Sequence, residues 1–592
     1  MNRHLSFAID LFCLVFLSFL FFIAFTGSYH LIIPDEGRYA EVAREMLTSG
    51  NWITPHLDGV VFLDKPILMY WLEAFAMKIW GVNEFAVRVF PACIGSLGVV
   101  LTYLAGRQLF NRRTAIASSL VLMTSLLYFL ATHYVDMDLL IAVLVSGALW
   151  FFIMAMSVGN DLQRKSYLWV AYIFAALAVL TKGLIGIVFP MMVIGVWILV
   201  LNEWRQLKRM CLLSGLGLFL LIVMPWYIMV QIHNPGFFHY FFIFEQFERY
   251  VGKGFNMHNP IYFYPLVIIV GMFPWVIFLF QSLLFAGKEI IVHRKAAFKL
   301  VFLVLWPLLI LIFFSIPKSK IVGYILPVFP PLAMLIGVYF DRYWNELAVK
   351  NSLRWALAAL CVLAVILVVA LMGVSFMPSL TATASRPYLF ILAFIVLAFT
   401  ILCYWMRKQH QHFSKIFFVL LLASVTTGIV GVSAVHTFQL KNQKSLAFIV
   451  KRAMTPDTKV AYFYDYSYDV PFYLQHRVYV VLPSWQGAHL REEDNWRSEL
   501  ALGIDEGPSQ KTMIDYQQLQ QLWNSGQPVL VIVKNWKLHL FKESISENFK
   551  QVGQYGNFFV ISNQLAHPAT SVSPQLPPPE SQGSSKQGSL KQ

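Results

Sequence analysis

The chain has 592 residues, of which 58% are hydrophobic and only 13% are charged, and its formal net charge at pH 7 is +14. This apolar composition excludes an ordinary soluble enzyme and predicts a polytopic membrane protein. In such a protein Lys and Arg collect in the short turns between spans, where they meet anionic lipid, so the positive charge does not indicate a nucleic-acid partner.

Apolar runs long enough to cross a bilayer recur along the first 438 residues and predict about thirteen transmembrane helices. The runs are 6–26, 85–106, 114–132, 138–158, 167–181, 184–202, 210–231, 261–286, 299–315, 321–340, 354–376, 387–406 and 415–436. The first run follows a short basic flank and lacks a small-residue cleavage site. We therefore expect a retained span and not a removed signal peptide.

The division between the fifth and sixth runs, at Thr181–Gly183, is decided by length and orientation. Without it, residues 167–202 would form a helix about 50 Å long, well beyond a bilayer core. With thirteen spans and the N-terminus inside, basic turns such as Arg112–Arg113 and Arg407–Lys408 all lie on the inner side. The positive-inside rule requires this arrangement, and merging the two runs would invert every later turn.

This topology gathers polar residues from distant segments on the outer face, as a site at a membrane surface requires. These residues are Asp35, Glu36, Asp64, Lys65, Asp136, Asp138, Lys182, Glu245, Arg249, His258, Lys318, Lys320 and Tyr324. Asp35 and Glu36 follow the first span, where hydrocarbon gives way to headgroups and lipid phosphates. The alternative is that Asp35 only caps a helix ending near Gly50. Capping would leave Glu36 and Arg38 unexplained.

Two long segments, residues 27–84 and 232–260, are expected as outer-face loops. Parts of both, residues 34–80 and 237–250, combine aromatic and charged side chains and are predicted to lie in the headgroup layer. The alternative for each aromatic residue is an ordinary interfacial belt.

The composition changes after residue 438. Strand-like runs at 460–464, 478–482, 529–533 and 558–561 alternate with helical patterns near 445–454 and 514–523. We expect a transmembrane domain at 1–438, a small α/β domain outside the membrane at 439–565, and a disordered tail at 566–592. A Gly-rich nucleotide loop is absent from the sequence, which argues against a nucleotide-sugar or ATP site.

Short motifs spread over residues 1–340 resemble those of the undecaprenyl-phosphate aminoarabinose:lipid A transferase family. The motifs are Pro34-Asp-Glu-Gly-Arg-Tyr39 continuing to His56, Phe62-Leu-Asp-Lys-Pro66, Leu180-Thr-Lys-Gly183, His239-Tyr-Phe-Phe242, His258-Asn-Pro260, Phe314-Ser-Ile-Pro-Lys-Ser-Lys320 and Tyr324-Ile-Leu326. Family members are GT-C-type membrane glycosyltransferases related to protein O-mannosyltransferases. The resemblance therefore implies an α-helical GT-C fold, with the small C-terminal α/β domain outside the membrane.

The resemblance also implies substrates, membrane and site residues. The donor would be a polyprenyl-phosphate sugar and the acceptor lipid A or a related envelope glycolipid, with the active site on the periplasmic face of the bacterial inner membrane. Asp35 matches the principal catalytic carboxylate of the family, with Glu36 beside it, and Asp138 matches a further acidic residue. The implied donor-phosphate ligands are Lys65 and Tyr324, with Arg38, Lys318 and Lys320 as helpers.

A divalent metal, zinc or magnesium, follows only from the resemblance. Its ligands would be Asp64, where family members often carry Glu, and His258. Two ligands are too few to predict a metal from the sequence alone.

The expected chemistry is an inverting transfer in which cations stabilise the leaving lipid phosphate and Asp35 serves as the base for an attacking hydroxyl. A protein or polysaccharide acceptor is the alternative within the same class. A lipid flippase or transporter would also explain many spans, but transporters tend to place charges near the midplane and to show repeats. The predicted charges cluster at one face, which favours the enzyme.

Overall fold

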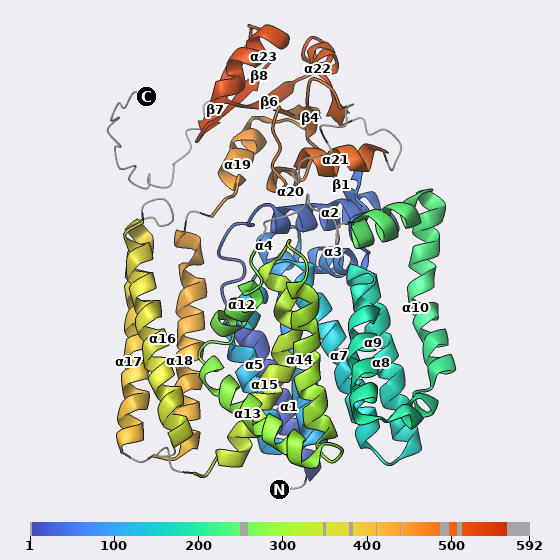
Figure 1. Cartoon of the computed structure of the whole chain (residues 1–592). Coiled ribbons are helices and arrows are strands. Elements are labelled where there is room, and N and C mark those ends of the chain that lie inside the picture. Colours follow the sequence, from blue (N-terminus) through green and yellow to red (C-terminus); the bar gives the residue numbers. More distant parts are fainter. Residues whose placement is uncertain are drawn as a thin grey trace.

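A computed structural model describes residues 3–248, 259–346, 351–377, 383–409, 411–438, 440–485, 490, 496–505 and 512–564. Figure 1 shows long helices running side by side, with a small sheet domain at one end and the N-terminus at the other. The predicted disordered tail, Arg249 and His258 lie outside the described residues.

Ten helical segments among the described residues are long and apolar enough to cross a membrane. They are α1 (Arg3–Ile23), α4 (Glu84–Leu109), α7 (Met137–Ser157), α10 (Leu212–His233), α13 (Val276–His293), α14 (Phe298–Ser315), η3 (Val322–Val328) with α15 (Phe329–Tyr343), α16 (Asn351–Ser375), α17 (Arg386–Lys408) and α18 (Phe413–Ala434). The fold class is confirmed, but the expected number of thirteen spans is not.

The three expected spans outside this set are helical but shorter or more polar. Residues 114–132 form two helices, α5 (Arg112–Thr124) and α6 (Leu126–Ala131), because the backbone of Ser125 is extended. The helix α9 (Ile185–Leu201) has 17 residues, and α8 (Asp161–Lys182) begins and ends with charged residues. The run 261–286 is also divided, into α12 (Phe263–Gly271) and α13.

The predicted division at Thr181–Gly183 is confirmed. The helix α8 ends at Lys182, Gly183 follows with φ +74°, and α9 begins two residues later. A positive φ favours glycine, which adopts it without a Cβ clash. The chain then folds back tightly, since a Cβ on Gly186 would lie 2.5 Å from the carbonyl carbon of Ala178.

Two outer helices separate the membrane helices from the sheet domain (Figure 1). They are α2 (Asp35–Ser49) and α3 (Leu68–Trp80), joined through a short antiparallel hairpin of β1 (His56–Leu57) and β2 (Val60–Val61). Ten of the fifteen residues of α2 are buried. The helix ends at Gly50 in a left-handed cap, as the sequence predicts.

The aromatic outer segment forms a π-helix, η2 (His239–Glu248). Phe237, Tyr240 and Phe241 are buried, and Phe237 packs edge-on against Trp226 of α10 at 5.6 Å. At these three positions the aromatic side chains form a packed cluster and not simply a belt in the headgroup layer.

The C-terminal part forms a six-stranded sheet of order β5-β4-β3-β6-β8-β7. Its strands are β3 (Lys459–Phe463), β4 (Tyr479–Val481), β5 (Met513–Ile514), β6 (Val529–Lys534), β7 (Lys550–Tyr555) and β8 (Phe558–Ser562). The first four pair in parallel, and β7 and β8 are antiparallel. The helices are α19 (Lys444–Ala453), α20 (Asp469–Leu474), α21 (Trp496–Asp505), α22 (Tyr516–Trp523) and α23 (Leu538–Ser544).

The predicted strands and helices of this domain are confirmed, but two strands were not predicted. The strand β5 has two residues, and β7 is almost entirely exposed, so neither carries an apolar pattern. The domain docks directly on the outer helices. A Cβ on Gly37 of α2 would lie 2.9 Å from the backbone nitrogen of Asp469 in α20, and Arg477 pairs with Glu45 of α2 at 2.5 Å.

Candidate active site

Asp35 lies at the start of α2 with its carboxylate partly open to solvent. The residue before the helix is Pro34, and the side chain of Asp35 is in the first turn, so the capping alternative for Asp35 is wrong. One carboxylate oxygen accepts a hydrogen bond from Arg38 Nη2 at 2.5 Å, and the other accepts one from the Tyr134 hydroxyl at 3.0 Å. Its side chain remains 33% exposed. The carboxylate is thus oriented but still reachable.

Tyr134 acts as a donor to Asp35. Burial, with a further contribution from the Asp35 carboxylate, raises the pKa of Tyr134 well above its usual value. The phenol therefore keeps its proton and continues to donate to the carboxylate at any physiological pH.

Glu36 is in a different environment and is completely buried. Its two oxygens accept hydrogen bonds from Arg88 at 2.9 and 2.6 Å and from the backbone nitrogens of Ile32 and Val135 at 2.7 and 3.1 Å. Arg88 also binds three backbone carbonyls before α2. Glu36 and Arg88 therefore hold the chain leading into α2 and the segment after α6.

A second cluster surrounds the beginning of α7. The ammonium of Lys182 forms an ion pair with Asp138 and lies 4.4 Å from the ring centroid of Tyr324. Burial, then the Asp138 and Asp35 carboxylates, raises the pKa of Asp136 well above its usual value. The segment before α7 is bonded to the start of α2, since Tyr134 donates to Asp35 and the backbone nitrogen of Val135 donates to Glu36, so this cluster lies close to Asp35.

A third cluster joins the loop before α3 to the π-helix. Lys65 donates to Glu245 at 3.1 Å and to the backbone carbonyl of Asp64 at 2.9 Å. Asp64 accepts a hydrogen bond from the Tyr240 hydroxyl at 2.6 Å. The loop leads into α3, where the ring of Tyr70 lies 6.2 Å from that of Tyr39 in α2, so this cluster also adjoins α2.

Lys318 and Lys320 occupy the loop between α14 and η3. Lys320 is buried, and its ammonium donates to the backbone carbonyls of Asn259 and Pro317 at 2.9 and 2.5 Å. Lys318 is exposed. The two lysines therefore differ, because only Lys318 offers an exposed side chain to an anionic ligand.

The predicted metal stays a prediction. Among the described residues, no three His, Cys, Asp or Glu side chains form a group that could hold a metal ion. Asp64 is the described member of the predicted ligand pair, and one of its oxygens already accepts from Tyr240.

Sequence reasoning did not select four residues that contact the predicted site: Tyr134, Tyr240, Tyr468 and Glu499. Tyr134 is two residues before Asp136, and Tyr240 belongs to a motif that the resemblance had identified. Tyr468 and Glu499 belong to the C-terminal domain, which carries no recognised motif. For them the sequence contained no signal.

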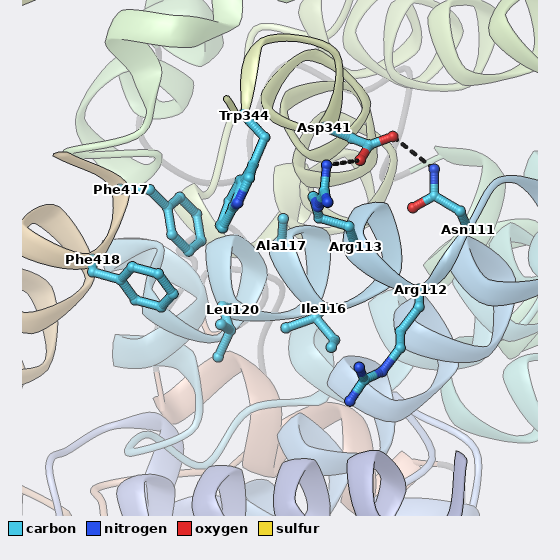
Figure 2. Close-up of a pocket in the computed structure, with 10 residues that line it drawn as sticks. All are labelled: Asn111, Arg112, Arg113, Ile116, Ala117, Leu120, Asp341, Trp344, Phe417 and Phe418. Atoms are coloured by element: carbon cyan, nitrogen blue, oxygen red, sulfur yellow. Dashed lines mark hydrogen bonds and ion pairs between the residues drawn. The ribbon is translucent and has the colours of Figure 1, made fainter. Parts of the chain in front are cut away.

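A cavity of about 580 Å³ lies between α5, α15 and α18, toward the end of the helices that is opposite the sheet domain (Figure 1). Figure 2 shows Asn111 and Arg113 directed at Asp341, with Trp344, Phe417 and Phe418 along the other side. Arg112 pairs with Asp10 at 2.7 Å. Both arginines of this cavity are therefore paired with carboxylates of the protein itself.

Comparisons with known proteins agree with the motif-based assignment. The family described as dolichyl-phosphate-mannose-protein mannosyltransferase matches residues 64–229. The undecaprenyl phosphate-alpha-4-amino-4-deoxy-L-arabinose arabinosyl transferase of Erwinia tasmaniensis is 32% identical over 57% of this chain and 62% of its own length. A Proteus mirabilis protein of the same name, numbered 1, is 33% identical over 52% of this chain and 55% of its own length. The chain thus spans less than two thirds of these relatives.

The fold likeness extends much further than the sequence likeness. The crystal structure of ArnT from Cupriavidus metallidurans bound to undecaprenyl phosphate matches with a TM-score of 0.81 at 23% identity, covering 95% of this chain and 98% of that one. The structure of the same protein in the apo state matches with a TM-score of 0.77. The chain therefore has the fold of ArnT, and over somewhat more than half of its length it is similar in sequence to these arabinosyl transferases.

Proposed function

We propose that this protein transfers a sugar from a polyprenyl-phosphate donor to lipid A or a related envelope glycolipid, at the outer face of the bacterial inner membrane. The observation that carries the proposal is the convergence of Asp35, the Asp138–Lys182 pair and Lys65. Tyr134, just before α7, donates to Asp35, and Tyr70, just after Lys65, packs against Tyr39 of α2. The similarity to undecaprenyl phosphate-dependent arabinosyl transferases supports undecaprenyl phosphate as the carrier.

Breaking the donor requires stabilisation of the leaving phosphate. The bond between the anomeric carbon and the phosphate oxygen breaks, and its electron pair remains on the phosphate. Lys65 and Lys182 are held in place at the edge of the site by ion pairs with carboxylates. Lys318, two residues before the buried Lys320, has an exposed side chain. Cations positioned before the reaction stabilise the growing charge without further reorganisation.

Asp35 is suited to accept a proton from the attacking group. Its carboxylate is oriented by Tyr134 and Arg38 and remains one third exposed. If the acceptor is a hydroxyl, Asp35 removes its proton as the new bond to the anomeric carbon forms. If the acceptor is a lipid phosphate, that group is already ionised, and the site contributes mainly positioning. A single displacement inverts the anomeric configuration.

Glu36 and the metal have different places in this proposal. Glu36 is saturated with donors, and we assign it the positioning of α2. A divalent metal at Asp64 and His258 remains a proposed addition to the site.

The first experiment is Asp35→Asn in protein reconstituted with donor and lipid A. We expect sugar transfer to fall by about 10²–10⁴-fold, the usual contribution of general-base catalysis, with binding of undecaprenyl phosphate unchanged. Asp457→Asn, which alters an exposed carboxylate of the C-terminal domain, is the matched control.

Mass spectrometry of lipid A and of membrane proteins from cells with and without the gene identifies the acceptor. A pentose- or hexose-sized addition on lipid A is the expected result. An addition on protein instead would favour the alternative acceptor, and loss of lipid flipping with intact sugar transfer in Asp35→Asn would contradict the proposed role of Asp35.

A further inference from the structure

The C-terminal sheet domain reaches the candidate active site through one carboxylate. Glu499, on α21, forms an ion pair with Nη1 of Arg38, while Nη2 of the same guanidinium binds Asp35 at 2.5 Å. Arg38 is therefore shared between an acid of the membrane part and an acid 461 residues away in sequence.

The shared guanidinium is enclosed on its remaining sides. It lies 5.1 Å from the ring centroid of Tyr39 and 5.6 Å from that of Tyr468. The side chains of Arg38 and Glu499 are only 14% and 16% exposed. In such a poorly solvated place an ion pair is screened little, and its geometry matters more than at an open surface.

Glu499 is itself oriented by its own domain. Its second carboxylate oxygen accepts a hydrogen bond from the Tyr468 hydroxyl at 2.7 Å. Tyr468 immediately precedes α20, and α20 packs against Gly37, one residue from Arg38. The position of Glu499 is thus tied to the contact between α20 and α2.

We propose that Glu499 is a positioning residue for Asp35, acting through Arg38, so that the C-terminal domain completes the active centre. This inference rests on the proposed function of Asp35. A guanidinium tends to bind a lone carboxylate in a bidentate manner, through two parallel hydrogen bonds. Because Glu499 binds Nη1 of Arg38, only Nη2 binds Asp35. The second carboxylate oxygen of Asp35 can then interact with Tyr134 and with the acceptor.

The test compares Glu499→Gln with Arg477→Gln. Arg477→Gln also breaks an ion pair between the C-terminal domain and α2, with Glu45, but it does not contact Arg38 or Asp35. In Glu499→Gln, we expect both Nη1 and Nη2 of Arg38 to bind Asp35 and to displace its carboxylate. We expect kcat to fall by about 10- to 100-fold, as for a small misplacement of a reacting group, with the donor KM unchanged. Arg477→Gln should retain kcat, and Glu499→Asp should recover part of it.

A double-mutant cycle separates positioning from general stabilisation. If Glu499 acts through Arg38, Glu499→Gln has no further effect on kcat in an Arg38→Met background. Additive losses, an unchanged kcat in Glu499→Gln, or equal losses in Glu499→Gln and Arg477→Gln would overturn the inference.

The outcomes also separate this inference from the proposed function. An inactive wild-type protein would contradict the proposed function itself, whereas active wild type with active Glu499→Gln would contradict only the positioning role. A measurement without substrate supplements the kinetics: amide hydrogen exchange in the first turn of α2 should change in Glu499→Gln but not in Arg477→Gln. Unchanged exchange in Glu499→Gln would contradict the coupling.

Discussion

Asp35 and Glu36 are adjacent carboxylates, but α2 directs them into different surroundings. Asp35 is one third exposed and binds one arm of Arg38, whereas Glu36 is fully buried and bonded to Arg88. Removing one partner of a buried ion pair leaves an uncompensated charge, which typically costs about 3–5 kcal/mol. Loss of Glu36 should therefore impair folding, and only Asp35 offers a carboxylate whose variants report on chemistry.

At the same scale, the buried carboxyl group of Asp469 should make the stability of the protein depend on pH. It is buried where α20 meets α2, and burial raises its pKa from the usual 3.8 to about 6, in spite of hydrogen bonds from Ser467 and the backbone of Gln443. As pH rises from about 4 to 6 the unfolded chain releases this proton while the folded protein retains it. The contribution of Asp469 to the free energy of unfolding is therefore fully present at low pH and is lost as pH rises through 6. The loss amounts to roughly 3 kcal/mol at most.

Thermal unfolding of wild type and Asp469→Asn between pH 4 and 7 tests this sign. Because Asn does not titrate, the Tm of the variant minus the Tm of wild type should increase as pH rises. A constant difference over this range would show that Asp469 has an ordinary pKa.

At the scale of elements, the contact between α2 and α20 determines where the C-terminal domain meets the site. The two helices approach so closely at Gly37 that an added Cβ would lie 2.9 Å from a backbone atom, which cannot rotate away. The closeness brings Tyr468 and Glu499 to Arg38. A small residue at position 37 is thus a structural requirement of the proposed active centre.

Gly37→Ala should separate the two helices. We expect a loss of about 1–3 kcal/mol from overpacking, which exceeds the gain of about 1 kcal/mol in helix propensity, together with reduced sugar transfer. Gly431→Ala in α18 is the control, since a Cβ there meets nothing within 4 Å. Thermal unfolding and the transfer assay measure both effects, and equal behaviour of the two variants would contradict the close contact.

At the scale of the whole molecule, the candidate site and the sheet domain share one end of the helices, and the basic turns lie at the other (Figure 1). Charged residues of the site are thereby kept out of the hydrocarbon, where each would be costly. The arrangement would also allow the proposed lipid-borne donor and the proposed lipid acceptor to approach from one leaflet.

Cysteine labelling tests this orientation in a variant whose five native cysteines are replaced by Ser. Ser49→Cys, exposed at the end of α2, should react with a membrane-impermeant maleimide in intact spheroplasts. Lys208→Cys, exposed in the turn η1 (Trp204–Arg209), should react only after lysis. The reverse pattern would place the site on the cytoplasmic side.

The sequence by itself determined the membrane character, the division at Gly183, the principal strands of the C-terminal sheet and the likeness to the arabinosyl transferases. Each of these depends on local features: hydropathy over about 20 residues, alternation in strands, or short motifs. It also predicted that Asp35, Asp138 and Lys65 share one face of the membrane, because span counting assigns each residue to a face.

Only the tertiary structure decided which charges pair. Glu36 with Arg88, Lys65 with Glu245 and Arg38 with Glu499 join segments 52 to 461 residues apart. Such pairs depend on how the helices and the sheet domain pack against one another, and this packing cannot be predicted from local sequence propensity. For this reason the sequence could not show that Glu36 is bonded to Arg88 or that Glu499 contacts Arg38.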